Sequence, residues 1–370
     1  MPDLKRTLVK KYIRLLRSAF PWAVDTRKHI VFEACEKFHY FHMEPIIENI
    51  IKDGRFRVSI VKWSGFDKQD MLPGVNYLSF NEFWHDWFNI YDILITTELE
   101  RRPGWFQNGT AICMFHGAGP KMSYIKNPEI NAYDVVFSVG PMTYKVQQAF
   151  VKKSVSVEKI GLPITDGLIS DEPVPLPESI NLDSSKPTLL YAPSWSTNPD
   201  LISMDNDILD ALAGLHNYNV IIRPHPLLLA PEKCRDFDWN PKINELKASG
   251  IQISYAKDHS IYEIMQRIDV LLGDISSVTY EYLVFDKPVV LYMKEGVLAA
   301  FDAEEFATPL LDASTRLNAA GDLKSTLNAL NDGNDNKQSA ARKKLRDDTF
   351  YNIGTATECA VRTIEKYAFD

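Results

Sequence analysis

Short hydrophobic runs alternate along the chain with longer segments whose apolar side chains recur at a helical period. In the first half, runs typical of strands lie at residues 29–35, 57–63, 91–97, 111–115, 135–139 and 157–160, with helical patterns at 42–53 and 142–151. A second series of strand-like runs lies at 188–192, 219–222, 251–255, 270–272 and 288–292, with helices expected at 205–215, 241–249, 260–267 and 277–284. This alternation predicts mainly parallel sheets covered by helices, an α/β fold.

The rhythm is interrupted at residues 171–187, where four prolines stand among acidic and serine residues. Prolines at this spacing favour an extended linker between domains. A chain of 370 residues is long enough to bury two hydrophobic cores. We therefore expect an N-terminal domain at 26–170, a C-terminal domain at 188–352 and, at 353–370, a helix that packs back on the first domain.

The first 25 residues predict a basic amphipathic helix. The first twenty contain six Lys and Arg residues against a single Asp. On a helical projection the apolar residues Leu4, Leu8, Tyr12, Leu15, Leu16 and Ala19 fall on one side, and the cations Arg6, Lys10, Arg14 and Arg17 fall on the other. Such a helix either lies on an anionic membrane surface or docks on the first domain as ordinary structure, and amphipathicity does not separate the two readings.

Composition narrows the class of protein. A net charge of −8 argues against general nucleic-acid binding, because proteins that bind the phosphate backbone normally carry a basic surface. The four cysteines are far apart, without zinc-binding spacing or a dense disulfide pattern. No apolar run is long enough to cross a bilayer, and the amino terminus lacks the pattern of a secretory signal. We expect a cytoplasmic enzyme associated peripherally with the inner face of the cell membrane.

Two motifs at the ends of predicted strands point to phosphate chemistry. Arg-Pro-His-Pro at 223–226 places Arg223 and His225 before prolines, which favours extended geometry and puts both side chains on one side. Asp-Ile-Ser-Ser at 274–277 brings Ser276 and Ser277 to the start of a predicted helix, where backbone N–H groups are free to bind an anion. Together they predict a pocket for a phosphate or diphosphate at the carboxyl ends of parallel strands.

The order of several motifs resembles the CDP-glycerol glycerophosphotransferase family of teichoic-acid and capsule synthesis. They are Tyr-Ala-Pro-Ser-Trp at 191–195, Arg-Pro-His-Pro at 223–226, Asp-Ile-Ser-Ser at 274–277 and Asp-Lys-Pro at 286–288, preceded by His-Gly-Ala-Gly-Pro-Lys at 116–121. The resemblance implies a GT-B-like α/β architecture, with two Rossmann-like domains facing across a cleft. It also implies transfer of glycerol phosphate from CDP-glycerol, or of a related polyol phosphate from its CDP-polyol donor, to a hydroxyl of a lipid-linked or polymeric acceptor.

The sequence departs from the family pattern where the transferred group would be recognised. The family usually continues with Thr-Pro-Leu after its His-Gly pair, and here Ala118, Gly119 and Pro120 take those places. Ile275 stands where an aromatic residue is often found. Glycerol phosphate is the default expectation, and ribitol phosphate or another activated phosphate unit remains open.

With the resemblance in view, each candidate residue has an expected role. His116, at the end of a predicted strand, suits a general base, because a neutral imidazole accepts a proton near pH 7; the alternative is a strand-end histidine with a structural bond. Arg223 and His225 are expected to hold the diphosphate and stabilise the departing nucleotide. Lys121 and Ser276 with Ser277 would neutralise or bind phosphate charge, Ser194 would line the donor pocket, Asp274 would orient His225 or a donor hydroxyl, and Glu281 would accept from a ribose hydroxyl.

Two further motifs have structural explanations. Asp205-Asn206-Asp207 matches a metal-binding pattern of nucleotide-sugar enzymes, but it opens a predicted helix, where aspartate is a favoured cap. The aromatic segment at 83–88 is expected to be a partly buried helix. We expect neither a metal nor another cofactor. The alternatives are a nucleotide-sugar glycosyltransferase or epimerase of the same fold that uses a UDP or GDP donor, and a non-catalytic nucleotide-binding scaffold.

Overall fold

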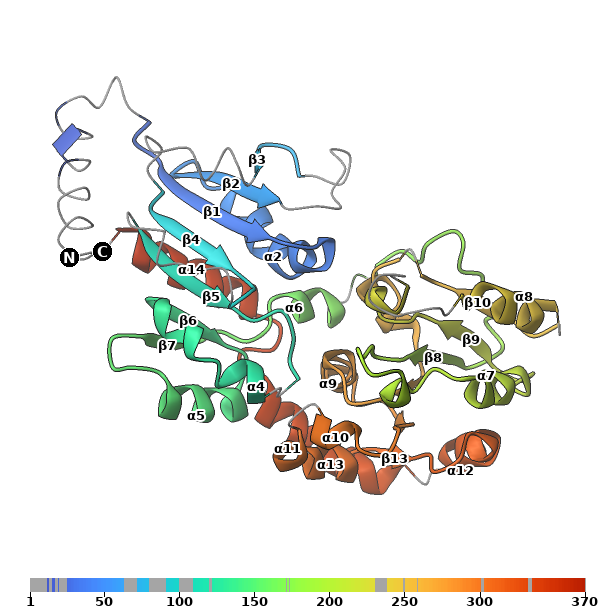
Figure 1. Ribbon diagram of the computed structural model, residues 1–370. Helices are drawn as coiled ribbons and strands as arrows, with labels where there is room; N and C mark the ends of the chain where they lie inside the picture. Colours follow the sequence, from blue (N-terminus) through green and yellow to red (C-terminus); the bar gives the residue numbers. More distant parts are fainter. Residues whose placement is uncertain are drawn as a thin grey trace. The chain divides into compact units, whose positions relative to one another are not determined.

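The chain folds into two compact units, each built on a parallel sheet (Figure 1). The computed structural model describes residues 12, 15–16, 19, 25–62, 72–79, 91–99, 109–119, 122–170, 172, 174–229, 238–248, 250–257, 259–300, 303–331 and 335–369. The first unit comprises Met1–His116, Tyr124–Gly167 and Phe350–Asp370, and the second comprises Gly117–Ser123 and Leu168–Thr349. Most of the predicted N-terminal helix, the aromatic segment at 83–88 and Lys121 lie outside the described residues.

The first unit contains a seven-stranded sheet in the order β3-β2-β1-β4-β5-β6-β7. Its strands are β1 (Lys28–Ala34), β2 (Phe56–Lys62), β3 (Asn76–Ser79), β4 (Ile93–Thr96), β5 (Thr110–Met114), β6 (Val135–Ser138) and β7 (Ser156–Lys159). Every neighbouring pair is parallel. The nearly continuous apolar runs of β4 and β6 are fully buried, as expected of parallel strands covered on both faces.

Helices α2 (Lys37–Ile50), α5 (Pro141–Phe150) and α6 (Ile164–Leu168) follow strands of this sheet, with a short α4 (Met122–Ile125) and the 3₁₀ turn η3 (Pro128–Ala132). The final helix, α14 (Ala356–Phe369), belongs to the first unit and runs beside its sheet (Figure 1). Its residues Ala360 and Ile364 join the core formed with α2, and the Tyr367 hydroxyl donates to Glu158 of β7 over 2.7 Å.

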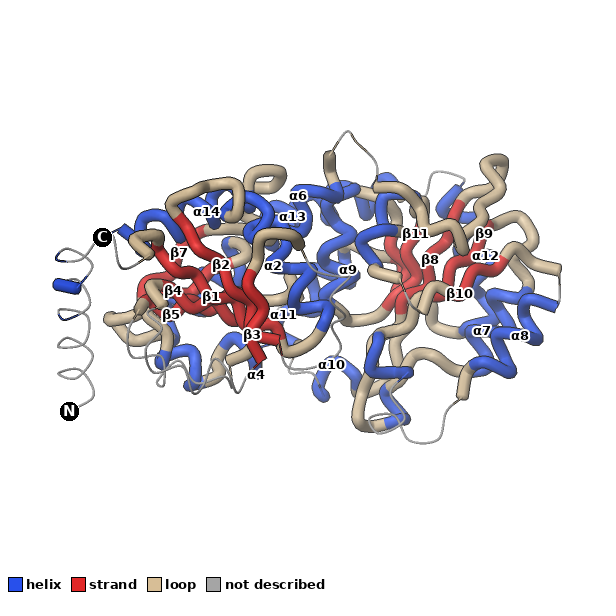
Figure 2. Tube along the Cα trace, turned by 90° about the horizontal axis from the view of Figure 1, so that it is seen from above, coloured by secondary structure: helices blue, strands red, loops and turns tan. Residues whose placement is uncertain are grey.

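The second unit contains a six-stranded parallel sheet in the order β10-β9-β8-β11-β12-β13. Its strands are β8 (Thr188–Ala192), β9 (Asn219–Ile222), β10 (Ile253–Tyr255), β11 (Val270–Gly273), β12 (Val289–Leu291) and β13 (Thr315–Arg316). The α-helices are α7 (Asn206–Ala213), α8 (Asn240–Ala248), α9 (Ser277–Tyr282), α10 (Val297–Ala300), α11 (Glu304–Asp312), α12 (Leu323–Ala329) and α13 (Asn336–Thr349). Figure 2 shows the strands of each unit flanked by helices. The predicted α/β class with two Rossmann-like units is confirmed.

Local structure differs from the sequence prediction at residues 260–267. Two 3₁₀ turns, η6 (Ile261–Glu263) and η7 (Met265–Arg267), replace the expected α-helix. Ser260 caps the first turn through the Tyr262 N–H, and Ile264, with φ of −108°, lies between the two turns. Further 3₁₀ turns are η4 (Pro199–Leu201), η5 (Pro226–Leu229), η8 (Leu283–Phe285) and η9 (Ala320–Asp322). Among the described residues, no helix is both long and apolar enough to span a membrane.

A buried arginine fastens α13 to the turn before β12. The Arg342 side chain is 1% exposed and pairs with Asp335 at 2.6 Å and with Asp286 at 3.3 Å. Asp286 adopts a left-handed conformation, with φ of +50°, at the end of η8. The Arg342 guanidinium also donates to the Asp286 carbonyl, so it holds both the side chain and the backbone of this turn.

Replacement of Arg342 by alanine should destabilise the protein by about 3 kcal/mol, because it leaves two largely buried carboxylates without their main partner. Urea unfolding at pH 7 measures the effect. Lys344→Ala is the matched control on the same helix, because the Lys344 side chain is 80% exposed and its pair with Asp348 lies at the surface. Equal unfolding midpoints for the two variants would contradict the structural role of Arg342.

Candidate functional site

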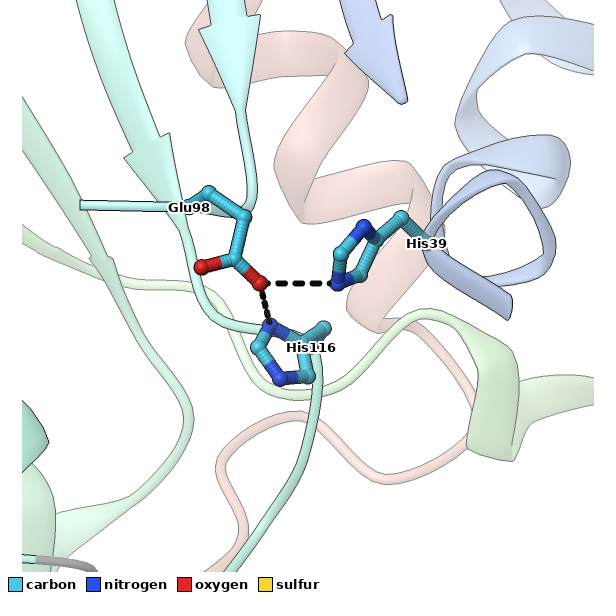
Figure 3. Close-up of side chains that lie close together, drawn as sticks. All are labelled: His39, Glu98 and His116. Carbon is cyan, nitrogen blue, oxygen red and sulfur yellow. Dashed lines mark ion pairs between the residues drawn. The ribbon is translucent and has the colours of Figure 1, made fainter. Parts of the chain in front are cut away.

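In the first unit, three segments converge because β1, β4 and β5 are neighbours in the sheet. Parallel strands end at the same edge, so the residues that follow them are brought together. Helix α2 starts just after β1, Thr97 and Glu98 follow β4, and His116 follows β5. The convergence places His39 of α2, Glu98 and His116 side by side (Figure 3).

The proton of the neutral His116 ring is fixed on one nitrogen. His116 Nδ1 lies 3.1 Å from the backbone carbonyl oxygen of Thr97 and 3.8 Å from Glu98 Oε1. A carbonyl oxygen only accepts hydrogen bonds, so Nδ1 carries the hydrogen and Nε2 keeps its lone pair. Nε2 lies on the side of the ring away from Glu98 (Figure 3), and the side chain is 30% exposed. This geometry suits the predicted general base.

His39 and Glu98 are functional candidates that the sequence prediction missed. The Glu36 N–H donates to His39 Nδ1 over 3.2 Å, which leaves the ring proton on Nε2. That nitrogen faces Glu98 Oε1 at 2.9 Å, and the His39 side chain is 2% exposed. Neither residue lies in a motif, and only the strand order brings them to His116.

The same three side chains have the composition of a metal site, because their ligand atoms lie within 4.8 Å of one another. A histidine ligand must offer a lone pair to the metal. His39 Nδ1 already accepts from the Glu36 N–H, so Nε2 carries the proton, and this nitrogen makes no hydrogen bond to any described residue. In this proton arrangement His39 has no lone pair to offer a metal.

The second histidine of α2, His42, adds no positive charge to this cluster. His42 is buried, and burial, reinforced by His116 and His39, holds its pKa well below the ordinary value. The His42 ring is thus neutral at physiological pH. Its centroid lies 6.4 Å from that of His116.

In the second unit, the Arg-Pro-His-Pro segment extends β9 alongside the end of β8. The N–H groups of Arg223 and His225 donate to the carbonyls of Tyr191 and Pro193, at 2.9 and 3.0 Å. Two residues that both bond toward the same neighbouring strand have side chains on the same face of the extended chain. The geometry predicted for Arg223 and His225 is therefore present.

Arg223 is anchored by backbone carbonyls rather than by a carboxylate. Its Nε donates to the His259 carbonyl over 3.0 Å, and its Nη1 donates to the Pro224 carbonyl over 2.8 Å. No ion pair of Arg223 occurs within the part of the chain that the structure describes. Burial lowers its pKa from the ordinary value, and a guanidinium with that starting point stays charged. Its charge is thus held in place for an anionic partner.

The His225 ring has the opposite proton arrangement to that of His116. The Leu227 N–H donates to His225 Nδ1 over 3.2 Å, so the neutral ring carries its hydrogen on Nε2. The Trp195 ring lies beside it, with centroids 6.0 Å apart. His225 therefore presents a donor, as a phosphate oxygen requires.

Asp274 fixes the loop after β8. Its carboxylate Oδ2 accepts from the Ser194 N–H, the Ser194 hydroxyl and the Ser203 hydroxyl, each over 2.8 Å, and the residue is 2% exposed. The expected bond to His225 is not among these contacts. Ser194 is thus oriented by Asp274 at the strand end where the donor pocket was predicted.

The start of α9 is approached closely by the glycine loop that follows His116. A Cβ on Gly117 would lie 2.8 Å from Ser277 Cβ, so only glycine fits without displacement. The Ser276 hydroxyl lies 3.3 Å from the Thr279 hydroxyl and makes no capping hydrogen bond to the helix, although serine is a favoured helix cap. Ser276 and Ser277 therefore stay candidates for phosphate binding.

Glu281 is fully buried beneath this glycine loop. Its Oε2 accepts from the Tyr262 hydroxyl over 2.8 Å, and the carboxyl group interacts with the Ala118 N–H. Burial raises the pKa of the Glu281 carboxyl to about 7. The predicted contact with a ribose hydroxyl finds no support in this interior position, which instead ties the loop to α9.

The structure confirms that Asp205 is a helix cap. Its Oδ1 accepts from the Ile208 N–H at the start of α7 over 2.9 Å, while Oδ2 pairs with Lys294 and accepts from the Tyr292 hydroxyl. The resemblance of this segment to a metal motif is therefore explained by capping.

The buried carboxyl group of Glu281 should make the stability of the protein depend on pH. Between about pH 4.5 and 7 the folded protein keeps a proton that the unfolded chain has lost, so this group lowers stability as the pH rises, with the full cost above pH 7. Glu281→Gln removes the titration, and its stability relative to wild type should increase from pH 5 to pH 8 by on the order of 3 kcal/mol. Thermal melts across this range measure it. The exposed Glu245→Gln should follow wild type, and a parallel course for Glu281→Gln would refute the prediction.

The family model described as CDP-Glycerol:Poly(glycerophosphate) glycerophosphotransferase matches residues 119–365. The chain is 23% identical over 150 residues to a teichoic acid glycerol-phosphate primase of Bacillus subtilis, covering 40% of this chain and 35% of that protein. It is 26% identical over 176 residues to the teichoic acid ribitol-phosphate polymerase TarK of Staphylococcus aureus, covering 44% of this chain and 30% of that protein. The matches thus span about a third of the length of these relatives.

The fold is also similar to a solved structure of the wall teichoic acid polymerase TagF. The TM-score is 0.66 with 18% identity, and the match covers 99% of this chain and 97% of that chain. At this identity the similarity establishes the shared fold.

Proposed function

The chain belongs to the CDP-glycerol:poly(glycerophosphate) glycerophosphotransferase family, and from this premise we propose that it transfers a polyol phosphate from a CDP-activated donor to a hydroxyl of a glycan acceptor. The observation that carries the proposal is the proton arrangement of His116, whose Nε2 keeps a lone pair while Nδ1 bonds the Thr97 carbonyl. A positioned base with this geometry is what activation of a hydroxyl nucleophile requires.

In the proposed reaction, the acceptor hydroxyl gives its proton to His116 Nε2 as its oxygen attacks the phosphorus that bears the polyol. The new oxygen–phosphorus bond replaces the bond to CMP, which leaves with the bonding electron pair. The products are a phosphodiester, CMP and one proton, which His116 releases to solvent. Positioning and charge stabilisation account for most catalysis of this kind.

Arg223 and His225 are proposed to bind the diphosphate and to stabilise the charge that develops on CMP. The fixed guanidinium of Arg223 and the Nε2–H of His225 are both donors, which suits phosphate oxygens. Ser276 and Ser277 would add hydroxyl donors, and Lys121 a further positive charge. With cations and donors supplied by side chains, we propose that no metal is needed.

The identity of the polyol stays open between glycerol and ribitol. The two curated relatives are named for glycerol phosphate and for ribitol phosphate. A nucleotide-sugar transferase or epimerase would use the same fold with a UDP or GDP donor. A direct comparison of turnover with CDP-glycerol, CDP-ribitol, UDP-sugars and GDP-sugars separates these possibilities.

The two sites should respond differently to substitution. His116→Gln should lower kcat by about 100- to 10,000-fold and leave donor affinity mostly intact, because it removes only the base. Arg223→Ala should weaken donor binding, since it removes a charged hydrogen bond. Calorimetry with CDP-glycerol and a CMP-release assay in EDTA measure both effects. A fully active His116→Gln enzyme would contradict the role of His116 as the base. Activity that is lost in EDTA and restored by magnesium would contradict the metal-independent reaction. Faster turnover of a UDP-sugar than of CDP-glycerol or CDP-ribitol would contradict the CDP donor.

We propose further that residues 1–22 hold the enzyme on an anionic membrane surface, where a lipid-linked acceptor would be found. Six cations would each contribute about 1 kcal/mol near such a surface, and the apolar stripe would add insertion. Two members of the stripe, Tyr12 and Leu15, have side chains 63% and 65% exposed, as a membrane-contacting face requires. The docked-helix alternative would bury this stripe.

Binding should depend on the cations of this segment. In vesicle flotation, the full chain should bind phosphatidylglycerol vesicles more than neutral ones, and salt should weaken the binding by screening. The combined substitutions Lys10→Glu, Arg14→Glu and Arg17→Glu should abolish it. The matched control reverses three exposed lysines elsewhere, at Lys145, Lys152 and Lys344. Equal flotation of both variants, or none by wild type, would refute the membrane role.

A further inference from the structure

The first unit holds a carboxylate beside His116 that the proposed reaction has not yet used. Glu98 Oε1 lies 3.8 Å from His116 Nδ1 and 2.9 Å from His39 Nε2, so both rings contact the same oxygen (Figure 3). We propose that Glu98, held by His39, is a positioning residue that orients His116 and stabilises the imidazolium it forms. This inference rests on the proposed function, in which His116 takes the proton of the acceptor hydroxyl.

The backbone of Glu98 is held by two buried hydroxyl groups. Its carbonyl accepts from the Tyr133 hydroxyl over 2.9 Å and from the Thr96 hydroxyl over 3.2 Å. The Tyr133 and Thr96 hydroxyls lie 2.8 Å from each other, and both residues are buried. The chain at the end of β4 is therefore anchored, and with it the Thr97 carbonyl that bonds His116.

The side chain of Glu98 is in turn held by a ring whose proton cannot move away. His39 Nδ1 accepts from the Glu36 N–H, so the hydrogen is on Nε2. This nitrogen lies 2.9 Å from Glu98 Oε1, although the contact lacks the alignment of a hydrogen bond. A polar hydrogen beside the carboxylate favours its charged form. Glu36, His39, Glu98 and His116 thus form a connected series from the start of α2 to the proposed base.

Charge stabilisation comes from one side of the ring. From α2, His116 faces the edge of Phe38 and the rings of His39 and His42, and His42 stays neutral because of its burial. Two groups that interact with Glu98, Cys113 of β5 and Tyr133, have pKa values raised by burial and are neutral at physiological pH. Glu33 of β1 interacts with Tyr133. Glu98 supplies negative charge in direct contact with His116.

A negative charge at this distance makes proton uptake by His116 more favourable, and the base accordingly stronger. Its loss should weaken the base without touching the donor site, because Arg223 and His225 belong to the other unit. Without Glu98 the charged imidazolium of His116 loses its negatively charged partner, so the ring becomes protonated only at lower pH.

The test uses the full chain with Glu98→Gln, which keeps the shape of the side chain and removes its charge. Titration of His116 by nitrogen-15 NMR should show its pKa lowered by about one unit, a tenfold change in proton affinity. The acid limb of the kcat/KM profile should move to lower pH by the same amount. Turnover should fall about tenfold or more while KM for CDP-glycerol stays unchanged.

Two further variants keep the result interpretable. Glu98→Asp restores the charge on a shorter side chain and should return part of the pKa and part of the turnover. The exposed Glu48→Gln on α2 should behave as wild type. A His116 pKa that is the same in Glu98→Gln and wild type would overturn the inference. If the wild-type chain turned over no CDP-polyol, the proposed function would fail, and the titration would still decide whether Glu98 acts on His116.

Discussion

Every strand pair in the two described sheets is parallel, and this constraint decides where the chemistry of the chain gathers. Parallel strands all end at one edge, so residues that follow different strands meet there although they are far apart in the sequence. His116 follows β5 and Glu98 follows β4 in the first unit, while His225 follows β9 and Asp274 follows β11 in the second. The central strands β4, β6, β8, β9 and β11 are buried along their whole length, and the polar groups of the candidate site lie at strand ends.

Backbone groups near the strand ends determine which nitrogen of each histidine ring carries the proton. A carbonyl facing Nδ1 makes His116 an acceptor at Nε2, and an N–H facing Nδ1 makes His225 a donor at Nε2. The two rings thus have opposite capacities without any difference in residue type. The proposed transfer reaction needs a base for the acceptor hydroxyl and donors for the phosphate, and these two proton arrangements suit those proposed roles.

The sequence was sufficient for most strands and for the residues that follow them, because hydrophobic runs and proline-flanked motifs are local signals. Arg223 and His225 were found in this way, and the extended geometry expected for them is present. The short edge strands β3 and β13 were missed. His39 and Glu98 were missed since their partnership with His116 depends on the order β1-β4-β5, which no local pattern encodes. Similarly, Asp274 binds Ser203 and Ser194, and Glu281 is buried under the glycine loop, because of contacts between distant segments.

In this structure the neutral rings of His116 and His225 hold their protons on opposite nitrogens. A two-bond nitrogen-15 to proton correlation spectrum of the full chain at pH 8, assigned with His116→Gln and His225→Gln, measures this directly. We expect a neutral His116 with its hydrogen on Nδ1 and a neutral His225 with its hydrogen on Nε2. A neutral His116 ring with its hydrogen on Nε2 would have no lone pair there for the acceptor hydroxyl, and His116 could not act as the proposed base.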